Sequence, residues 1–245
     1  MSESVRMIPL ANLALAFIPV AVVIALLVRW SEDWRGAAYA VLRMVVQLLL
    51  IGYLLVWIFR ADTFWIVVGV VAVMIVASSW IALQPVRSRR RALLGPSLTA
   101  IAAGGTATLL LMTEVVLDLA PWYRPDYFVP LAGMVYANAM NTVSLAAERL
   151  QAEVAAGVAA ADARRRAFRA AMIPVTNSLL AVGLVSLPGM MTGQILSGVD
   201  PLVAVRYQIL VMCMVYGSAG LSAACFLALV ARSEAGAPPD EAAGN

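Results

Sequence analysis

The chain has 245 residues, of which 63% are hydrophobic and only 13% are charged, and its formal net charge is +3. A soluble domain would carry about 25% charged residues, so the composition excludes an ordinary soluble protein. The sequence contains no histidine, and all 17 of its basic residues are arginine.

These two absences restrict the chemistry that the chain can perform. Without histidine there is no imidazole base and no imidazole metal ligand. Without lysine there is no Gly-Lys pair for a phosphate-binding P-loop. We therefore expect no enzymatic activity, no bound cofactor and no metal site, and any ATP and magnesium would bind to a separate subunit. The small net charge does not indicate nucleic-acid binding.

The apolar residues come in runs of about 20, which is the length of a transmembrane helix. The predicted class is all-α: a polytopic transmembrane helical bundle of about seven spans, forming one permease domain over residues 1–232. The polar tail, residues 233–245, is expected to be disordered. In chain order the spans are expected at about Ile8–Val28, Ala37–Phe59, Thr63–Leu83, Leu93–Leu117, Phe128–Ala147, Ile173–Ser197 and Leu202–Ala231.

Seven spans put the two termini on opposite sides of the membrane. Twelve arginines fall in the loops after the first, third and fifth spans and near the C-terminus, and four fall on the other side. The positive-inside rule then places the N-terminus outside and the C-terminus in the cytoplasm.

Several residues within the spans have predicted roles. Arg43 and Gln47 lie one turn apart in the second span, where Arg43 either snorkels to the interface or faces a substrate. Gly104-Gly105 in the fourth span would let another helix approach closely. The loop after that span holds Trp122 and other aromatic residues typical of a membrane–water interface.

The segment of residues 148–172 is polar and must lie in water, because charges in hydrocarbon are costly. Leu150, Val154, Val158 and Ala161 fall on one stripe of a helix. A short amphipathic helix of this kind suits insertion into a groove on a partner protein. The alternative is an interfacial helix lying on anionic lipid. Four arginines fall close together in the segment: Arg164, Arg165, Arg166 and Arg169.

Two sets of residues are candidates for a translocation path. In the sixth span, Pro188, Gly189, Met190 and Met191 interrupt the helix, because proline removes a backbone donor and glycine adds freedom. The interruption is either a hinge or pore-lining constriction, or a simple packing kink. The fifth span contains three polar side chains, Asn138, Asn141 and Thr142. These side chains either line a hydrated path or form hydrogen bonds between helices.

The run Gly183-Leu-Val-Ser-Leu-Pro-Gly-Met-Met-Thr-Gly193 resembles the FetB-type (UPF0014) permeases. Further matching segments are Pro130-Leu-Ala-Gly-Met134, Asn138-Ala-Met140 and Tyr207-Gln208. The resemblance implies the membrane subunit of a bacterial ABC transporter in the cytoplasmic (inner) membrane, similar to plant permeases tied to aluminium tolerance. It implies a homodimer with two separate ATP-binding subunits, exporting iron or another metal or small solute.

The resemblance also assigns residues to coupling with the ATP-binding subunit. ABC permeases carry a cytoplasmic loop with an acidic residue followed by glycine, and Glu153 and Gly157 are the candidates here. Arg164, Arg165, Phe168 and Arg169 complete the predicted coupling set. The alternative function is an ATP-independent channel or secondary carrier, which would move solute without a partner.

Overall fold

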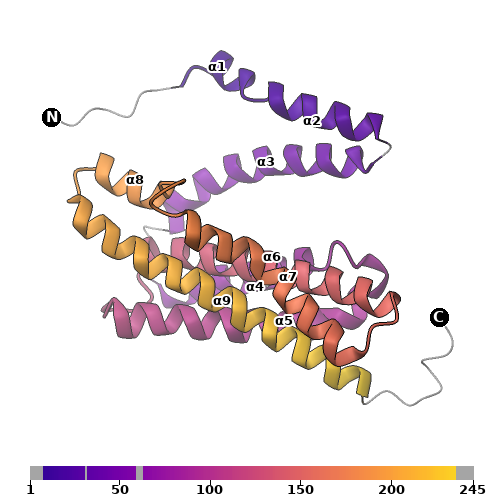
Figure 1. Cartoon of the computed structure of the whole chain (residues 1–245). Coiled ribbons are helices and arrows are strands. Elements are labelled where there is room, and N and C mark those ends of the chain that lie inside the picture. Colours follow the sequence, from indigo (N-terminus) through magenta and orange to yellow (C-terminus); the bar gives the residue numbers. More distant parts are fainter. Residues whose placement is uncertain (1–7, 31, 59–62, 236–245) are drawn as a thin grey trace. The chain divides into compact units, whose positions relative to one another are not determined.

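The computed structural model describes residues 8–30, 32–58 and 63–235, and these ranges are helical without any strand (Figure 1). The predicted all-α class is confirmed. The chain divides into two compact units, residues 1–61 and residues 62–245. Residues 236–245 of the predicted tail lie outside the described residues, and the last helix reaches further than predicted, to Ala235.

The first unit is a helical hairpin. It contains α1 (Leu10–Leu15), α2 (Ile18–Arg29) and α3 (Trp34–Ile58), and α2 packs against α3. The single span predicted over the first two helices is interrupted before Ile18. Pro19 lies in the first turn of α2, where a missing backbone N–H is tolerated, so a new helix begins there. No residue of α1 or α2 is buried within the described chain.

The second unit packs its helices around α6 and α9. Its elements are α4 (Phe64–Ala82), α5 (Arg90–Leu110), α6 (Pro125–Ala155), α7 (Ala160–Ala181), α8 (Gly189–Leu196) and α9 (Pro201–Ala235). Helix α9 contacts α5, α6, α7 and α8, and α6 contacts α4, α5 and α7. Tyr136 of α6 and Phe226 of α9 are among the fully buried side chains. A π-helical turn over Leu111–Val116 ends the fourth predicted span.

Close helix packing depends on two adjacent glycines of α5, as the sequence predicted. A Cβ atom on Gly104 would lie 2.7 Å from the backbone nitrogen of Ser222 on α9. A Cβ atom on Gly105 would lie 2.7 Å from the ring of Tyr136 on α6. Helix α5 therefore presents its glycines to both central helices. On the α6 side, the hydroxyls of Thr106 and Tyr136 are hydrogen-bonded at 2.8 Å.

Five stretches among the described residues are long and apolar enough to span a membrane: Leu10–Arg29, Trp34–Leu54, Phe64–Ala82, Arg87–Val116 and Pro201–Arg232. Helix α6 is not among them, since Asn138 and Asn141 lower its hydropathy. Helix α7 is not among them either, because its first half carries four arginines, and α8 is too short, with eight residues. Helix α6 has 31 residues, a length of about 46 Å, so it exceeds the thickness of a hydrocarbon core.

The polar segment of residues 148–172 is not a separate amphipathic helix, as the single stripe suggested. Leu150 and Val154 belong to α6, Ala161 belongs to α7, and the turn between them is centred on Gly157. The segment instead extends two long helices beyond their apolar parts. The prediction of one helix is wrong because a glycine with a positive φ angle ends α6 in the middle of the apolar stripe.

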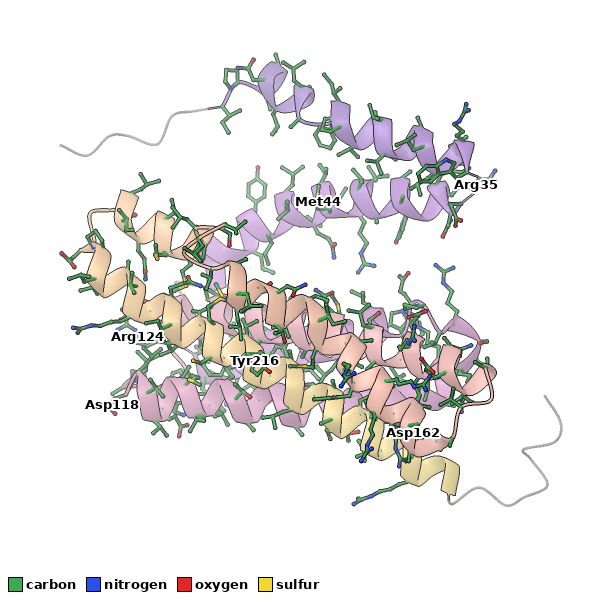
Figure 2. All side chains as sticks on the ribbon, in the orientation of Figure 1. Arg35, Met44, Asp118, Arg124, Asp162 and Tyr216 are labelled. Atoms are coloured by element: carbon green, nitrogen blue, oxygen red, sulfur yellow. The ribbon has the colours of Figure 1, made fainter. Side chains whose placement is uncertain are left out.

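Charged and aromatic residues gather at opposite ends of the second unit. The turn between α4 and α5, with Arg87–Arg91, and the turn between α6 and α7 lie at one end (Figure 1). Asp118 and Arg124 lie at the other end, far from Asp162 (Figure 2). Trp122 there makes edge-on contacts with Phe64 and Phe128, at centroid distances of 5.6 and 5.3 Å. An aromatic cluster at one end and arginines at the other are typical of a bundle that crosses a membrane.

Candidate functional site

The corner between α6 and α7 is shaped by Gly157, whose φ angle is +76°. Its N–H donates to the carbonyl of Val154 at 3.0 Å, and the N–H of Val158 donates to the carbonyl of Glu153 at 3.1 Å. These two bonds form a Schellman motif, which satisfies the last carbonyls of α6. Glycine suits this position because it adopts a left-handed conformation without steric cost. The corner is therefore a defined turn.

Glu153 lies three residues before the cap of α6, and it is buried, with 5% of its surface exposed. Its Oε1 atom accepts a hydrogen bond from Arg149, one turn earlier on α6. Its Oε2 atom lies 3.1 Å from Nη1 of Arg166 on α7. Both oxygens are thus paired, and the carboxylate ties the two helices together just behind the turn. Sequence reasoning proposed Glu153 for coupling but did not predict its two arginine partners.

The other four predicted coupling residues lie elsewhere, in a groove between α7 and the C-terminal part of α9. This outer groove has a volume of about 1060 Å³. Its α7 wall includes Arg164, Arg165, Phe168 and Arg169, and its α9 wall is formed by Ala224, Leu227, Ala228 and Ala231. The structure therefore separates the predicted coupling set into a corner and a groove.

The groove continues along the same two helices toward the middle of the bundle. This inner groove has a volume of about 770 Å³ and shares Phe168, Arg169 and Ala224 with the outer groove. Its remaining walls are largely apolar: Met172, Ile173, Thr176 and Asn177 on α7, and Tyr216, Gly217, Gly220 and Leu221 on α9. Together the two parts form one surface that is basic at one end and mainly apolar at the other.

The predicted interruption of the sixth span is longer than expected and begins earlier. Helix α7 ends at Ala181, residues 182–188 are non-helical, and α8 begins at Gly189. Gly183 has a φ angle of +83°, and its N–H donates to the carbonyl of Ser186 at 2.9 Å. The chain therefore leaves the helix at Val182, whose backbone is extended, and turns at Gly183; Pro188 is the residue that precedes α8. Leu184 and Val185 are 91% and 84% exposed in this segment.

A smaller cavity of about 290 Å³ lies between this non-helical segment and α9. Pro188 and Met191 of the predicted path line it, whereas Gly189 and Met190 do not. From α9 it is lined by Val205, Gln208, Ile209, Met212 and Cys213. Sequence reasoning did not select Gln208 as a site residue, although a buried glutamine in a membrane-length apolar helix is a signal for one.

The polar residues of α6 do not line this cavity or the grooves. Asn138 donates from its side-chain amide to the carbonyl of Met134 at 2.8 Å, and Thr142 donates to the carbonyl of Asn138 at 2.9 Å. Asn141 is exposed. These two bonds stay within α6, so they do not join it to another helix. Arg43 is half-buried and Gln47 is exposed on α3, in the other unit.

Comparison with known proteins identifies the family. A model of the uncharacterised protein family UPF0014 matches residues 10–234. The chain belongs to this family. A UPF0014 membrane protein of Synechocystis is 37% identical over 214 residues, which cover 81% of each chain. No solved structure matches the chain.

Other UPF0014 relatives carry names that indicate transport or metal tolerance. The probable iron export permease protein FetB of Escherichia coli is 32% identical over 238 residues, covering 89% of this chain and 90% of FetB. The protein ALUMINUM SENSITIVE 3 of Arabidopsis thaliana is 32% identical over 222 residues, covering 83% and 80% of the two chains. The resemblance noted at the run of residues 183–193 is confirmed.

The candidate sites of this UPF0014 chain contain few hard metal ligands. Among the described residues, no group of three or more histidine, cysteine, aspartate or glutamate side chains is arranged to hold a metal ion. The cavity beside the interrupted segment is lined mainly by aliphatic side chains, and its possible ligand groups are two thioethers, one thiol and one amide. This set can contact a solute, but it does not form an oxygen-rich cage for a hard cation.

Proposed function

We propose that this UPF0014 chain is the permease subunit of an ATP-driven exporter, and that a separate subunit binds and hydrolyses ATP. The observation that carries the proposal is the corner at residues 153–157, which two ion pairs and a Schellman motif hold in shape at the arginine-rich end of the bundle. The name of the FetB relative supports iron as one candidate solute, beside another metal or a small solute.

The proposal includes an orientation in the bacterial inner membrane. About seven spans cross it, with α6 and the pair α7–α8 as the two spans of lower hydropathy, the N-terminus outside and the C-terminus in the cytoplasm. The arginine-rich end of the second unit then faces the cytoplasm, in agreement with the positive-inside rule. The working complex contains two copies of this chain and two ATP-binding subunits.

Coupling would begin at the corner. An ATP-binding subunit that binds the exposed turn at Gly157 and the start of α7 would displace α7 along its axis. Glu153 positions the turn, because its ion pair with Arg166 joins α6 to α7 and its pair with Arg149 holds the carboxylate in place on α6. Arg164, Arg165, Phe168 and Arg169 lie in the outer groove beside α9, so the contact at the turn does not require them. The displacement would reach the non-helical segment at residues 182–188, which can absorb changes in backbone angles as a hinge.

The translocation path would pass the two elements that interrupt regular, apolar packing. One is the segment with Pro188, Gly189, Met190 and Met191, together with Gln208 of the adjoining cavity. The other is the polar face of α6 with Asn138, Asn141 and Thr142. Irregular backbone at membrane depth is tolerated where protein or a water-filled cavity covers it, which favours this location.

Reconstitution in liposomes tests the proposal. We expect loaded iron, or another tested metal, to cross only when this chain, its ATP-binding subunit and ATP are all present. Flux from the chain alone, without nucleotide, would instead establish a channel or secondary carrier. Loss of the complex with the ATP-binding subunit on changing the corner, with the fold intact, would locate the coupling contact.

A further inference from the structure

The outer groove between α7 and α9 contains arginines that have no carboxylate partner among the described residues. Arg166 is paired with Glu153, but no ion pair joins Arg164, Arg165 or Arg169 to a carboxylate among the described residues. Arg165 and Arg169 lie one helical turn apart and face the same groove. Two guanidinium groups one turn apart supply the charge and the hydrogen-bond donors that an anionic phosphate group requires.

The depth of the groove follows from the length of α9. Asp200 caps this helix by accepting hydrogen bonds from the N–H groups of Leu202 and Val203, at 2.8 and 3.3 Å, so the helix begins at a polar turn. At about 1.5 Å per residue, Gly217 lies about 24 Å and Ala224 about 35 Å along the axis. A hydrocarbon core is about 30 Å thick. For an α9 that crosses the membrane along its normal from this turn, the inner groove lies at hydrocarbon depth and the arginines beside Ala224 lie at headgroup depth.

The inner groove is suited to an acyl chain. Its walls include Met172 and Ile173 on α7 and Leu221 on α9, and Gly220 places no side chain between α9 and Met172. A Cβ atom on Gly220 would lie 3.5 Å from the terminal methyl carbon of Met172, so this part of the groove is narrow. In Figure 2, the label Tyr216 marks the stretch of α9 that lines the inner groove, and the label Asp162 marks the arginine-rich end of α7.

We propose that this groove binds an anionic phospholipid. The phosphate lies against Arg165 and Arg169, with Arg164 beside them, and one acyl chain follows the inner groove past Phe168 and Met172. Basic pockets between transmembrane helices at the cytoplasmic surface are typical sites for anionic headgroups. This inference requires only that the chain spans a membrane, so it does not depend on the proposed transport activity.

Two other occupants fit the groove less well. An acidic segment of an ATP-binding subunit matches the arginines, but a soluble protein does not reach the inner groove at hydrocarbon depth. A second copy of this chain, placed on a two-fold axis through the groove, would bring the arginines of both copies together, and like charges across an interface are unfavourable. A lipid matches both the basic and the apolar part.

Native mass spectrometry of the purified full chain in detergent tests the inference. Phosphatidylglycerol and phosphatidylcholine with identical acyl chains are titrated separately, without any ATP-binding subunit. We expect phosphatidylglycerol to bind at least roughly tenfold more tightly, because each guanidinium near an anionic surface contributes about a fivefold preference. The variant R165Q/R169Q should lose this preference, whereas R165K/R169K should keep most of it.

Two further variants separate the groove from general charge and from folding. R87Q/R91Q removes the same charge from the turn between α4 and α5, and it should bind phosphatidylglycerol as the unchanged chain does. A224L narrows the shared part of the groove without changing charge, and it should weaken the binding of both lipids. Each variant is compared by its melting temperature in detergent, and only those that melt near the unchanged chain are scored.

Three results would overturn the inference. The first is unchanged lipid preference in R165Q/R169Q. The second is displacement of phosphatidylglycerol by an equal concentration of glycerol phosphate, which would show a phosphate site without an acyl chain. The third is a variant R165Q/R169Q that keeps the lipid preference but no longer binds the ATP-binding subunit, which would assign these arginines to a protein contact.

Discussion

Nη1 of Arg166 on α7 lies 3.1 Å from Oε2 of the buried Glu153 on α6, so an ion pair joins the two helices beside the turn that connects them. The arginine is largely exposed and the glutamate is buried, with side-chain exposures of 59% and 6%. A bond of this kind contributes little when both partners are exposed and more when one is shielded from water. Its main effect is to fix the geometry of the corner.

Replacing Glu153 with glutamine removes the charge that both Arg149 and Arg166 contact. We expect the local stability of the corner to fall by about 1–2 kcal/mol. The loss is limited because the two arginines can be solvated by water once their partner is gone. Hydrogen exchange at the corner should become faster. A double-mutant cycle with R166Q should give a coupling energy of about 1 kcal/mol, and additive effects would show that the pair does not stabilise the corner.

Adding a side chain at Gly157 should destabilise the turn, although there is room for one. No atom would lie within 4 Å of an added Cβ atom, so the cost comes from the φ angle of +76° alone. We expect G157A to destabilise the corner by about 1 kcal/mol and G157N by less, since asparagine adopts this conformation more readily. Limited proteolysis at the turn measures the effect. G133A, in the middle of α6 with equal room for a Cβ atom, should be neutral, and equal proteolysis of the two variants would contradict the prediction.

Replacing Gly104 should also be destabilising, but for the opposite reason, which is lack of space for a side chain. A Cβ atom would lie 2.7 Å from the backbone nitrogen of Ser222, and a backbone atom cannot move aside as a flexible side chain can. We expect G104A to lower stability by about 1–3 kcal/mol and to loosen the packing of α5 on α9. The melting temperature in detergent checks this. G69A on α4, with nothing within 4 Å, is the matched control and should melt near the unchanged chain.

The non-helical segment of residues 182–188 should matter for transport more than for assembly. The variant G183A/P188A allows α7 to continue as a helix, because it removes the left-handed glycine and the proline that lacks an N–H. In reconstituted liposomes we expect binding of the ATP-binding subunit to persist and ATP-dependent flux to fall about tenfold or more. The control G193A, within α8, should keep its flux. Full flux in G183A/P188A would show that the segment is not a hinge.

Local sequence patterns were sufficient for the features that depend on short stretches of chain. The long apolar runs predicted helices, because a membrane-length apolar segment must satisfy its backbone hydrogen bonds internally. Gly104-Gly105 predicted a close helix approach, which the positions of Ser222 and Tyr136 confirm. The aromatic boundary at Trp122 stays a prediction, although Trp122 does contact Phe64. The run of residues 183–193 predicted the family. The count of about seven spans and their orientation stay predictions.

The tertiary structure decided which distant residues meet and where the helices end. Apolar periodicity could not reveal that Gly157 divides the stripe at Leu150–Ala161, because a left-handed residue ends a helix without changing the hydrophobic pattern. Nor could it reveal that Glu153 is buried between two arginines, or that Arg165 and Arg169 face the alanines of α9. Those relationships depend on how α6, α7 and α9 pack, and packing is a property of residues far apart in the chain.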